Sequence, residues 1–388
     1  MRLHLLLPAV KPAALAPPTA CPRPDCPGTL FRFHQAVRKP LRDTRYPQVA
    51  AHRYECLHCH HTFRVYPPGV TRACTSQRVR GLGVMLYLLG LSYGATALAL
   101  EALGAPLSKT QVYAAVQAAA AAVPGLRRDR LCDGVRTPAL GADLTSVRCC
   151  GQWLTLGLTV DAVRGTVLTI DELPDGEAAT LRDWLEPIAG AVGAEILVTD
   201  DADGFKTVAD GAGLAHQVCK SHVLRNTEQL IASLSEAVMG DPDGSLGAIE
   251  VTPEQAAADL ARWGELCRTR QPTEEGDVGA LHARYQGAAP PERGQKWSGA
   301  YRLRMLFLDR WELWRRLTRY RRWQGPEEEH IDGTNNATER AIGWWVKERY
   351  RMMRGYKVPE NAVNVSRLLA WAGNQLEGRG AALAEVLG

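Results

Sequence analysis

The sequence predicts an α/β protein in which a metal-binding module and a helical module precede a mixed sheet. Three observations lead to this fold class. Two close pairs of cysteines lie near the N-terminus, apolar residues recur with a helical period over residues 74–122, and the pattern changes to strand-like runs from Thr137 onward. The 388 residues are enough for two to four domains with at least one sizeable core.

Charge is distributed unevenly along a chain whose 46% hydrophobic and 23% charged residues are ordinary for a soluble globular protein. Residues 1–80 carry 13 Lys and Arg against 3 Asp and Glu, a net charge of +10. Residues 131–260 carry 7 against 21, a net charge of −14. This asymmetry indicates a polyanion-binding module joined to a segment that concentrates carboxylates, such as a cation site.

Two apolar segments are interpreted without an export signal or a membrane span. The apolar run in residues 1–18 is interrupted by Pro8 and Lys11, and we predict a disordered leader there. Residues 82–100 contain no charged residue and are about long enough to span a bilayer. A Gly-containing break in the middle of that run predicts two soluble helices joined by a turn instead.

Residues 19–70 are predicted to form a zinc ribbon. The motifs CPRPDC and CLHC supply two cysteine pairs separated by a strand-like stretch, and a tetrahedral zinc ion needs four such ligands. The candidate ligands are Cys21, Cys26, Cys56 and Cys59. A reducing cytoplasm favours a metal over disulfide bonds. His58, His60 or His61 could replace a cysteine or face solvent, and chance pairing of cysteines in a basic segment is the alternative.

Residues 74–125 are predicted to form a helix-turn-helix DNA-binding domain of three helices. Ser108 is a good N-terminal cap for the last helix, and Gly104 closes the helix before it. The last helix of such a unit would enter the major groove. The residues expected to face DNA are Lys109, Thr110, Gln111 and Tyr113. A plain helical bundle that joins two domains is the alternative.

From residue 137 onward the sequence predicts three strands, a helix, a strand, a helix and a strand. The strand-like runs are ALGADLTSVRCC, QWLTLGLTVDAV, GTVLTIDEL, AEILVTDD and AHQVC, and the helical runs are GEAATLRDWLEPIAGAV and GFKTVADG. This order is that of a ribonuclease-H-like α/β core. We predict its first part over residues 135–222, a helical insertion over 223–330, and its last part, with a Glu-bearing helix, over 331–375.

Asp143 and Asp200 are the first candidates for chemistry. Asp143 lies inside the first strand of the core and Asp200 follows the fourth, and in a sheet of this order the two strands would lie side by side. Two carboxylates at one sheet edge could share Mg²⁺ or Mn²⁺ ions, because these cations prefer oxygen ligands. Each Asp alone is weak support, because other acids stand at similar places, namely Asp161, Asp171, Asp201 and Asp203.

Three motifs in this order, VTDDADGFK, CKSHVLRN and TNNATER, resemble the core of DDE-type transposases of bacterial insertion sequences, in particular a Mutator-like branch and its zinc-ribbon-bearing relatives. The resemblance covers roughly residues 137–360, and Gly204 and Asn335 also match the family's motifs. It implies that two Mg²⁺ or Mn²⁺ ions are bound by three catalytic acids, Asp143, Asp200 and Glu339. It also implies active-site support by Cys219, His222, Arg225, Asn226 and Asn336.

The resemblance implies a transposase that binds the terminal inverted repeats of an insertion sequence and catalyses Mg²⁺-dependent DNA cleavage and strand transfer. Its expected partners are double-stranded DNA, at the element's ends and at the target, and further copies of the chain in a homodimer or larger synaptic complex. Its expected location is the nucleoid in a bacterial cytoplasm. Two alternatives stay open: a catalytically inactive, transposase-derived zinc-ribbon regulator that binds DNA, and a ribonuclease-H-like nuclease without strand transfer.

The Arg-rich stretch over residues 301–323 also allows two interpretations. Its arginines could contact phosphates, and its tryptophans could stack on unpaired bases. The alternative is an amphipathic helix with its tryptophans in a core and its arginines in solvent. The arginines predicted to bind DNA are Arg315, Arg316 and Arg319.

Two further motifs have both a structural and a functional interpretation. Cys219 and His222 have the spacing of zinc ligands, but a further ligand such as Cys267 is remote in the sequence. Asn336 and Glu339 have the spacing of a capping box, in which the Glu reaches back to the helix start. A Glu339 that faces Asp143 and Asp200 could not make that reach.

Overall fold

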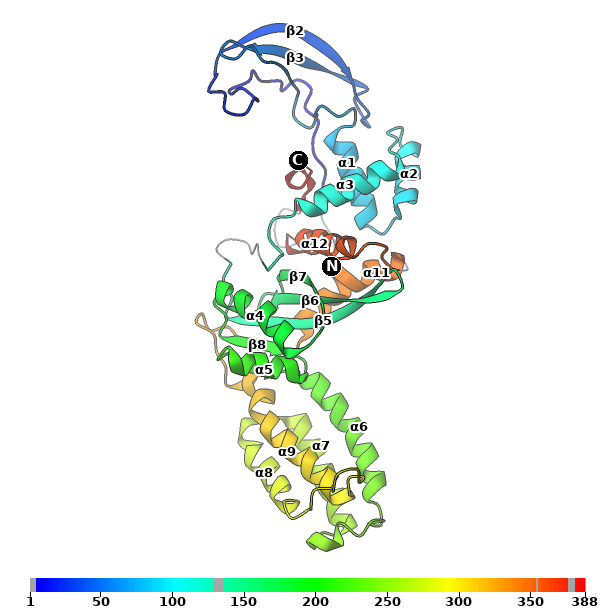
Figure 1. The fold of residues 1–388 in the computed structure, drawn as a ribbon, viewed down its shortest axis with the longest axis vertical. Helices are drawn as coiled ribbons and strands as arrows, with labels where there is room; N and C mark the ends of the chain where they lie inside the picture. The colour runs from blue at the N-terminus through cyan, green and yellow to red at the C-terminus, as the bar shows by residue number, and fades with distance from the viewer. Residues whose placement is uncertain (1–4, 129–134, 354, 376–380, 388) are drawn as a thin grey trace. The chain divides into compact units, whose positions relative to one another are not determined.

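The computed structural model describes residues 5–128, 135–353, 355–375 and 381–387 of the chain (Figure 1). These residues fall into two compact units. The first contains residues 1–126, 147–154 and 343–388, and the second contains residues 127–146 and 155–342. The second unit is therefore an insertion in the chain of the first.

The N-terminal part of the first unit is a three-stranded antiparallel sheet in the order β2-β3-β4. Its strands are β2 (Phe31–Pro40), β3 (Gln48–Cys56) and β4 (Thr62–Val65). Aromatic side chains from the three strands pack against one another, for example Phe31 on Phe63 with ring centroids 5.6 Å apart. This is the position of the predicted ribbon.

Three helices follow, as predicted, and each starts at a serine cap. They are α1 (Gln77–Leu88), α2 (Tyr93–Ala102) and α3 (Lys109–Ala121). The Oγ atoms of Ser76, Ser92 and Ser108 each accept a bond from a backbone N–H three residues on, which satisfies one donor of the first turn. The uncharged run over residues 82–100 is divided between α1 and α2, and none of the helices in the described residues is long and apolar enough to cross a membrane.

The predicted disordered leader is wrong for residues 5–18. Leu5 and Leu6 form a short strand, β1 (Leu5–Leu6), that pairs in parallel with β10 (Ala381–Ala382). Val10 is buried in a small cluster with Leu41, Val49 and Val70. Leu6 and Leu7 stay largely exposed, so the order of this segment comes from strand pairing at Leu5 and Leu6 and from burial of Val10, both with partners far along the chain that a local pattern does not show.

The C-terminal part of the first unit is helical. It contains α11 (Glu348–Met353), α12 (Pro359–Asn374) and a 3₁₀ turn, η5 (Leu383–Glu385). Helix α12 packs against α3. The π-helical turn η4 (Ile342–Lys347) carries Trp345, whose ring lies so close to Gly373 of α12 that a Cβ there would be 2.2 Å from it. The predicted last part of the core, residues 331–375, is thus shared between the two units.

The second unit is built around a five-stranded mixed sheet in the order β7-β6-β5-β8-β9. Its elements are β5 (Ala139–Cys149), β6 (Gln152–Asp161), β7 (Val167–Leu173), α4 (Ala178–Val192), β8 (Ile196–Thr199), α5 (Asp203–Gly211) and β9 (Ala215–Val218). Strands β5, β8 and β9 are mutually parallel, whereas β6 and β7 are antiparallel. The order of strands and helices along the chain is the predicted one, and the fold class of a mixed α/β protein is confirmed. Residues 147–154, at the β5–β6 turn, belong to the first unit.

Helix α4 covers the sheet with an apolar face that includes Leu181, Trp184 and Ile188. Trp184 reaches the sheet at Gly157, where a Cβ would lie 2.7 Å from the indole ring. The indole Nε1 donates to Oδ2 of Asp171 at 3.1 Å, so this buried carboxylate has a structural partner.

The insertion after β9 is helical, as predicted. It contains α6 (Lys220–Val238), η1 (Gly247–Ile249), α7 (Pro253–Thr269), η2 (Pro272–Glu274), α8 (Glu275–Arg284), α9 (Gly299–Leu317) and η3 (Arg319–Arg321). Helices α6, α7, α8 and α9 form a bundle (Figure 1). They share a core that includes Trp263, Tyr285 and Trp314. The last element of the second unit is α10 (Asn336–Ala341).

Candidate active site

Asp143 and Asp200 lie on neighbouring parallel strands in the same register. Gly141 of β5 is opposite Val198 of β8. Asp143 follows Gly141 by two positions, and Asp200 follows Val198 by two positions. Asp143 is therefore inside β5 and Asp200 directly follows β8, as the sequence predicted. Both side chains are half-buried.

Helix α10 carries Glu339 and is held against β5 close to Asp143. The buried side-chain amide of Asn335 donates to the carbonyl oxygen of Ala142 at 3.2 Å, one residue before Asp143. Gly141 makes this approach possible, because a Cβ there would lie 2.6 Å from Oγ1 of Thr338. The sequence motif did not indicate that Asn335 bonds to β5 or that Gly141 lies beside α10.

The capping-box interpretation of Asn336 and Glu339 is wrong. Asn335 occupies the cap position of α10, and its side chain makes no capping bond. Asn336 is exposed. The Glu339 carboxylate instead lies 3.5 Å from Nδ1 of His222, with Oε1 as the nearer oxygen. The predicted supporting Asn is therefore exposed, while its neighbour Asn335 positions the helix.

The Asp143 carboxyl is influenced by the charges of the other two predicted acids. Burial, and next the negative charge of Asp200, raise the pKa of the Asp143 carboxyl to about 7, and the charge of Glu339 adds to the rise. The backbone N–H of Leu144 donates to Asp143 at 2.7 Å, which opposes the shift. An excess of negative charge around a buried carboxyl is what a bound cation would relieve. In the described residues, however, the carboxylate oxygens of the three acids do not all lie within 4.8 Å of one another.

The neighbouring acid Asp201 is neutralised, which separates it from Asp200. Its carboxylate forms ion pairs with Lys206 at 2.9 Å and with the buried Arg310 at 3.0 Å. Lys206 also pairs with the exposed Asp203. Asp200 accepts a bond from the backbone N–H of Ala202 at 3.1 Å, and no ion pair to it is present among the described residues.

Asp161 and Asp171 also have structural roles. Asp161 accepts bonds from the backbone of the turn after β6 and pairs with Arg164 at 3.0 Å. Asp171 accepts the Trp184 indole bond described above. Asp143 and Asp200 differ from these acids in two ways. They lie on neighbouring strands, and neither has a cationic partner in the described residues.

Cys219 and His222 come together with Glu339 at the start of α6. One ligand atom from each of the three side chains lies within 4.8 Å of the other two, so they could hold a metal ion. Cys219 is fully buried at the cap position, where its backbone N–H donates to the carbonyl of Thr199 at 2.8 Å. The remote ligand considered from sequence, Cys267, lies instead in the core of the insertion beside Thr227. Glu339 is the third member that sequence spacing did not reveal.

Two other residues of the CKSHVLRN motif have no side-chain hydrogen bond or ion pair with the described part of the chain. Arg225 and Asn226 are exposed on α6. Gly204, a further residue of the resemblance, has a packing reason: a Cβ there would lie 2.8 Å from Leu181 of α4. The structural requirement at Gly204 is thus the close approach of α5 to α4.

The four cysteines of the predicted ribbon form a cluster that could bind a metal such as zinc. All four Sγ atoms lie within 4.8 Å of one another, with Cys21 3.7 Å from Cys59 and Cys26 3.9 Å from Cys56. Gly28 lets the chain pass the cluster, because a Cβ there would lie 2.5 Å from a cysteine Sγ. Tetrahedral thiolate sites of this type are closed and structural.

The histidines beside the ribbon differ in position. Nδ1 of His58 lies 3.7 Å from Sγ of Cys26, His60 bonds to Glu55 at 3.1 Å, and His61 stacks on Phe63. His58 thus brings a ring nitrogen to a cysteine sulfur, whereas His60 and His61 meet Cys56 through their backbones. The four-cysteine set is complete without it.

The residues predicted to face DNA are exposed at the start of α3. They are Lys109, Thr110, Gln111 and Tyr113. Gln111 completes a capping box, since its side chain accepts the Ser108 backbone N–H at 3.0 Å while Ser108 accepts the Gln111 N–H. The Gln111 side chain is therefore occupied by the helix start.

Ion pairs account for much of the arginine density in α9. Arg315 pairs with Glu275 at 2.8 Å, and Arg316 bonds both oxygens of Asp210 and also His216. Arg319 is half-buried in η3. The insertion core contains Trp314, whereas Trp311 is partly exposed and stacks on His282. The amphipathic-helix interpretation thus describes α9 well, and the predicted DNA contacts of these arginines stay predictions.

No known protein family and no curated protein matches this sequence significantly.

Proposed function

We propose that the protein is a DNA transposase that cleaves the ends of an insertion sequence and joins them to target DNA. The observation that carries this proposal is the placement of Asp143 and Asp200 in the same register of neighbouring strands, with Glu339 on the helix that Asn335 holds against β5. The charges of Asp200 and Glu339 also contribute to the raised pKa of Asp143. The motifs of the resemblance contain two of these acids, Asp200 in VTDDADGFK and Glu339 in TNNATER, and Asp143 precedes them in the first strand of the core.

The residues fit a pair of divalent cations by their chemistry. Asp143, Asp200 and Glu339 offer hard oxygen ligands, and no Lys or Arg in the described part of the chain forms an ion pair with any of them. Mg²⁺ or Mn²⁺ bound there would activate a water or a 3′ hydroxyl and stabilise the leaving oxygen at phosphorus. The protein's own contribution is to hold the acids in place.

Positioning of Glu339 is the part of this function that the structure explains in most detail. Asn335 fixes the start of α10 to β5, and Gly141 allows the helix to lie close to the strand. His222 lies beside the Glu339 carboxylate at 3.5 Å and limits the directions in which it can turn. The carboxylate is thereby kept near the two aspartates rather than at the helix start.

Binding of DNA ends is assigned to the first unit. Its N-terminal residues carry the basic excess of the chain, and polyanion binding by Lys and Arg draws its affinity from counterion release. The four-cysteine cluster would fix the ribbon with a zinc ion, and α3 presents exposed polar residues at its start. We expect binding to weaken steeply with salt.

The test uses DNA that carries the short inverted repeats bracketing the gene. Asp143→Asn, Asp200→Asn and Glu339→Gln should each lower Mg²⁺-dependent strand transfer by roughly a thousandfold, because a shared cation site contributes several kcal/mol at about 1.4 kcal/mol per tenfold in rate. Binding of the ends should be retained. Asp203→Asn is the matched control, since this exposed acid lies three residues after Asp200 and should keep full activity. Full activity in any one of the three variants would overturn its assignment.

A further inference from the structure

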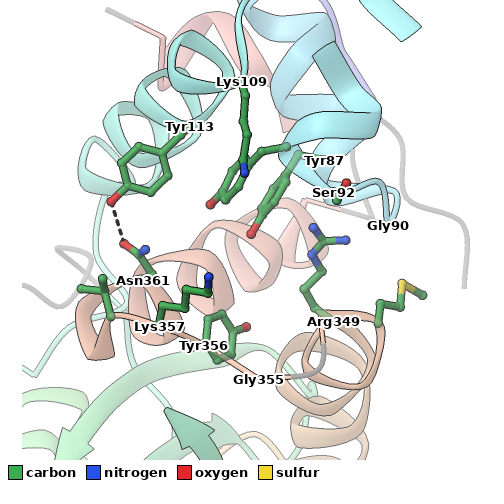
Figure 2. A pocket seen from close by; sticks show the side chains of 13 residues that line it. Tyr87, Gly90, Ser92, Lys109, Tyr113, Arg349, Gly355, Tyr356, Lys357 and Asn361 are labelled. Atoms are coloured by element: carbon green, nitrogen blue, oxygen red, sulfur yellow. Dashed lines mark hydrogen bonds between the residues drawn. The ribbon is translucent and has the colours of Figure 1, made fainter. Parts of the chain in front are cut away.

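A cavity of about 500 Å³ lies within the first unit, between the first three helices and the C-terminal helices. Its walls come from the α1–α2 turn, the start of α3, α11 and the residues that lead into α12 (Figure 2). A cavity of this size is in the range that accommodates small ligands. The side chains used below are Tyr87, Tyr93, Lys109, Tyr113, Arg349 and Lys357.

Arg349 is a buried cation with unused hydrogen-bond donors. Its residue is 3% exposed, its Nη2 donates to the carbonyl oxygen of Leu91 at 2.9 Å, and its guanidinium lies 4.0 Å from the ring centre of Tyr87. The Nε and Nη1 atoms are buried and have no hydrogen-bond partner, and no carboxylate pairs with this guanidinium among the described residues. A buried charge in this state is costly unless an anion completes it.

Two lysines add to the positive charge of the cavity. Lys109 and Lys357 are exposed at its mouth, and Figure 2 shows their side chains entering from opposite sides. None of the described residues that line the cavity is acidic. With Arg349 the lining carries three positive charges, which suits a phosphate group.

The rest of the lining is largely aromatic. Tyr87 and Tyr93 stack with ring centres 4.3 Å apart, and Arg349 covers Tyr87, so those ring faces are occupied. Tyr113 meets Tyr93 edge-on and is 37% exposed, and its hydroxyl donates to Oδ1 of Asn361 at 3.5 Å (Figure 2). Tyr113 therefore has ring surface left for a planar ligand.

We propose that this cavity binds one nucleotide, with its phosphate at Arg349, Lys109 and Lys357 and its base against Tyr113. The combination of an unpaired buried guanidinium with an exposed aromatic ring matches the two parts of a nucleotide, since sites for unpaired strands join cationic groups to stacking rings. That the nucleotide belongs to an unpaired segment of DNA, and not to the free pool, rests on the proposed function. The cavity itself does not depend on the three acids of the second unit.

The test is binding of a fluorescent single-stranded oligonucleotide to the full chain, followed by anisotropy. Lys109→Gln, Lys357→Gln and Tyr113→Leu change exposed positions and should each weaken binding by roughly tenfold. Arg351→Gln is the matched control, because this exposed arginine lies on α11 two residues from Arg349 and does not line the cavity. Arg349→Lys should also weaken binding, with the melting temperature measured to confirm that the variant is folded.

Competition identifies the source of the nucleotide. Unlabelled oligonucleotide that displaces the probe far below the concentration of free deoxynucleoside monophosphate supports an unpaired strand, and the reverse order supports a free-nucleotide site with the same chemistry. Equal binding of wild type and all four cavity variants, or an equal loss in Arg351→Gln, would overturn the proposal. Oligonucleotide binding is measured without divalent cations and independently of strand transfer, so a failure of the transposase proposal can be told apart from a failure of this one.

Discussion

Nδ1 of His222 lies 3.5 Å from Oε1 of Glu339, and this contact places Glu339 in a set with Cys219 and His222 that could hold a metal ion. The set offers one oxygen, one nitrogen and one sulfur ligand. Under the proposed function the same carboxylate would also serve the oxygen ligands of Asp143 and Asp200, so one side chain would be available to two kinds of cation.

We expect a soft cation to bind at Cys219, His222 and Glu339. In a chain whose ribbon is already loaded with zinc, Cd²⁺ should produce a thiolate-to-metal absorption, because sulfur and imidazole favour this ion over Mg²⁺. Cys219→Ser should remove the absorption, whereas Cys150→Ser, at an exposed cysteine outside the cluster, should keep it. The same Cd²⁺ should inhibit Mg²⁺-dependent cleavage, and Cys219→Ser should relieve that inhibition by roughly tenfold. An absorption that persists in Cys219→Ser contradicts this site.

The Asp143 carboxyl should make the metal-free protein less stable as the pH rises. Its pKa is raised from 3.8 to about 7 in the folded state, so the folded state binds more protons than the unfolded state between these values. Stability from this group is full below pH 3.8 and is lost as the pH rises to about 7. Asp143→Asn should therefore raise the free energy of unfolding by roughly 1 to 4 kcal/mol at pH 8, at about 1.4 kcal/mol per pKa unit.

The measurement is urea unfolding of both proteins across this pH range without divalent cations. The difference between Asp143→Asn and wild type should shrink as the pH falls toward 4. Adding Mg²⁺ at pH 8 should raise the melting temperature of wild type but not of the variant, because only a competent site binds the ion in the folded state. A variant that is less stable than wild type at pH 8 would show that the acids do not repel one another as inferred.

Removal of one ribbon cysteine should release one equivalent of zinc. Cys56 is fully buried and its Sγ lies 3.9 Å from that of Cys26, so Cys56→Ser opens the cluster and should unfold the ribbon. Zinc content per chain and circular dichroism provide the readouts. Cys74→Ser, at an exposed cysteine outside the cluster, should retain the metal. Retention of the full zinc content in Cys56→Ser would rule out the four-cysteine set.

Gly141→Ala should separate α10 from β5. The new Cβ would lie 2.6 Å from Oγ1 of Thr338 and 2.7 Å from Cγ2 of Val160, so we expect a loss of roughly 1 to 3 kcal/mol in the free energy of unfolding. Gly190→Ala in α4 is the control, because nothing lies within 4 Å of its added Cβ and the helix should gain about 0.5 to 1 kcal/mol. Denaturant titrations of the two variants that shift in the same direction would contradict this packing.

The sequence predicted those features that depend on short stretches of chain. The apolar period and the Ser108 cap located the helices α1 to α3, and the change of period located the strands and helices of the core along the chain. This order in turn placed Asp143 beside Asp200. The features that it missed depend on partners remote in the chain. Asn335 meets Ala142, Arg310 meets Asp201, and Leu5 meets Ala381, and no local pattern contains these pairs.

The Arg349 cavity shows the same limit for function. Lys109 and Tyr113 could be singled out in sequence as exposed polar residues of a helix, but Arg349 stands 240 positions after Lys109. Its unpaired donors become informative only when the surrounding residues are known to hold no acid. The capping box of Ser108 and Gln111 is likewise visible only in the side-chain geometry.

Pairing of β1 with β10, and packing of α3 on α12, have a consequence for synthesis on the ribosome. The second unit is translated completely before residues 343–388 of the first unit, so it can fold while the first unit is still incomplete. The first unit acquires its closing contacts only at the end of translation. A nascent chain would thus contain Asp143, Asp200 and Glu339 before Arg349, and with it the cavity, has been made.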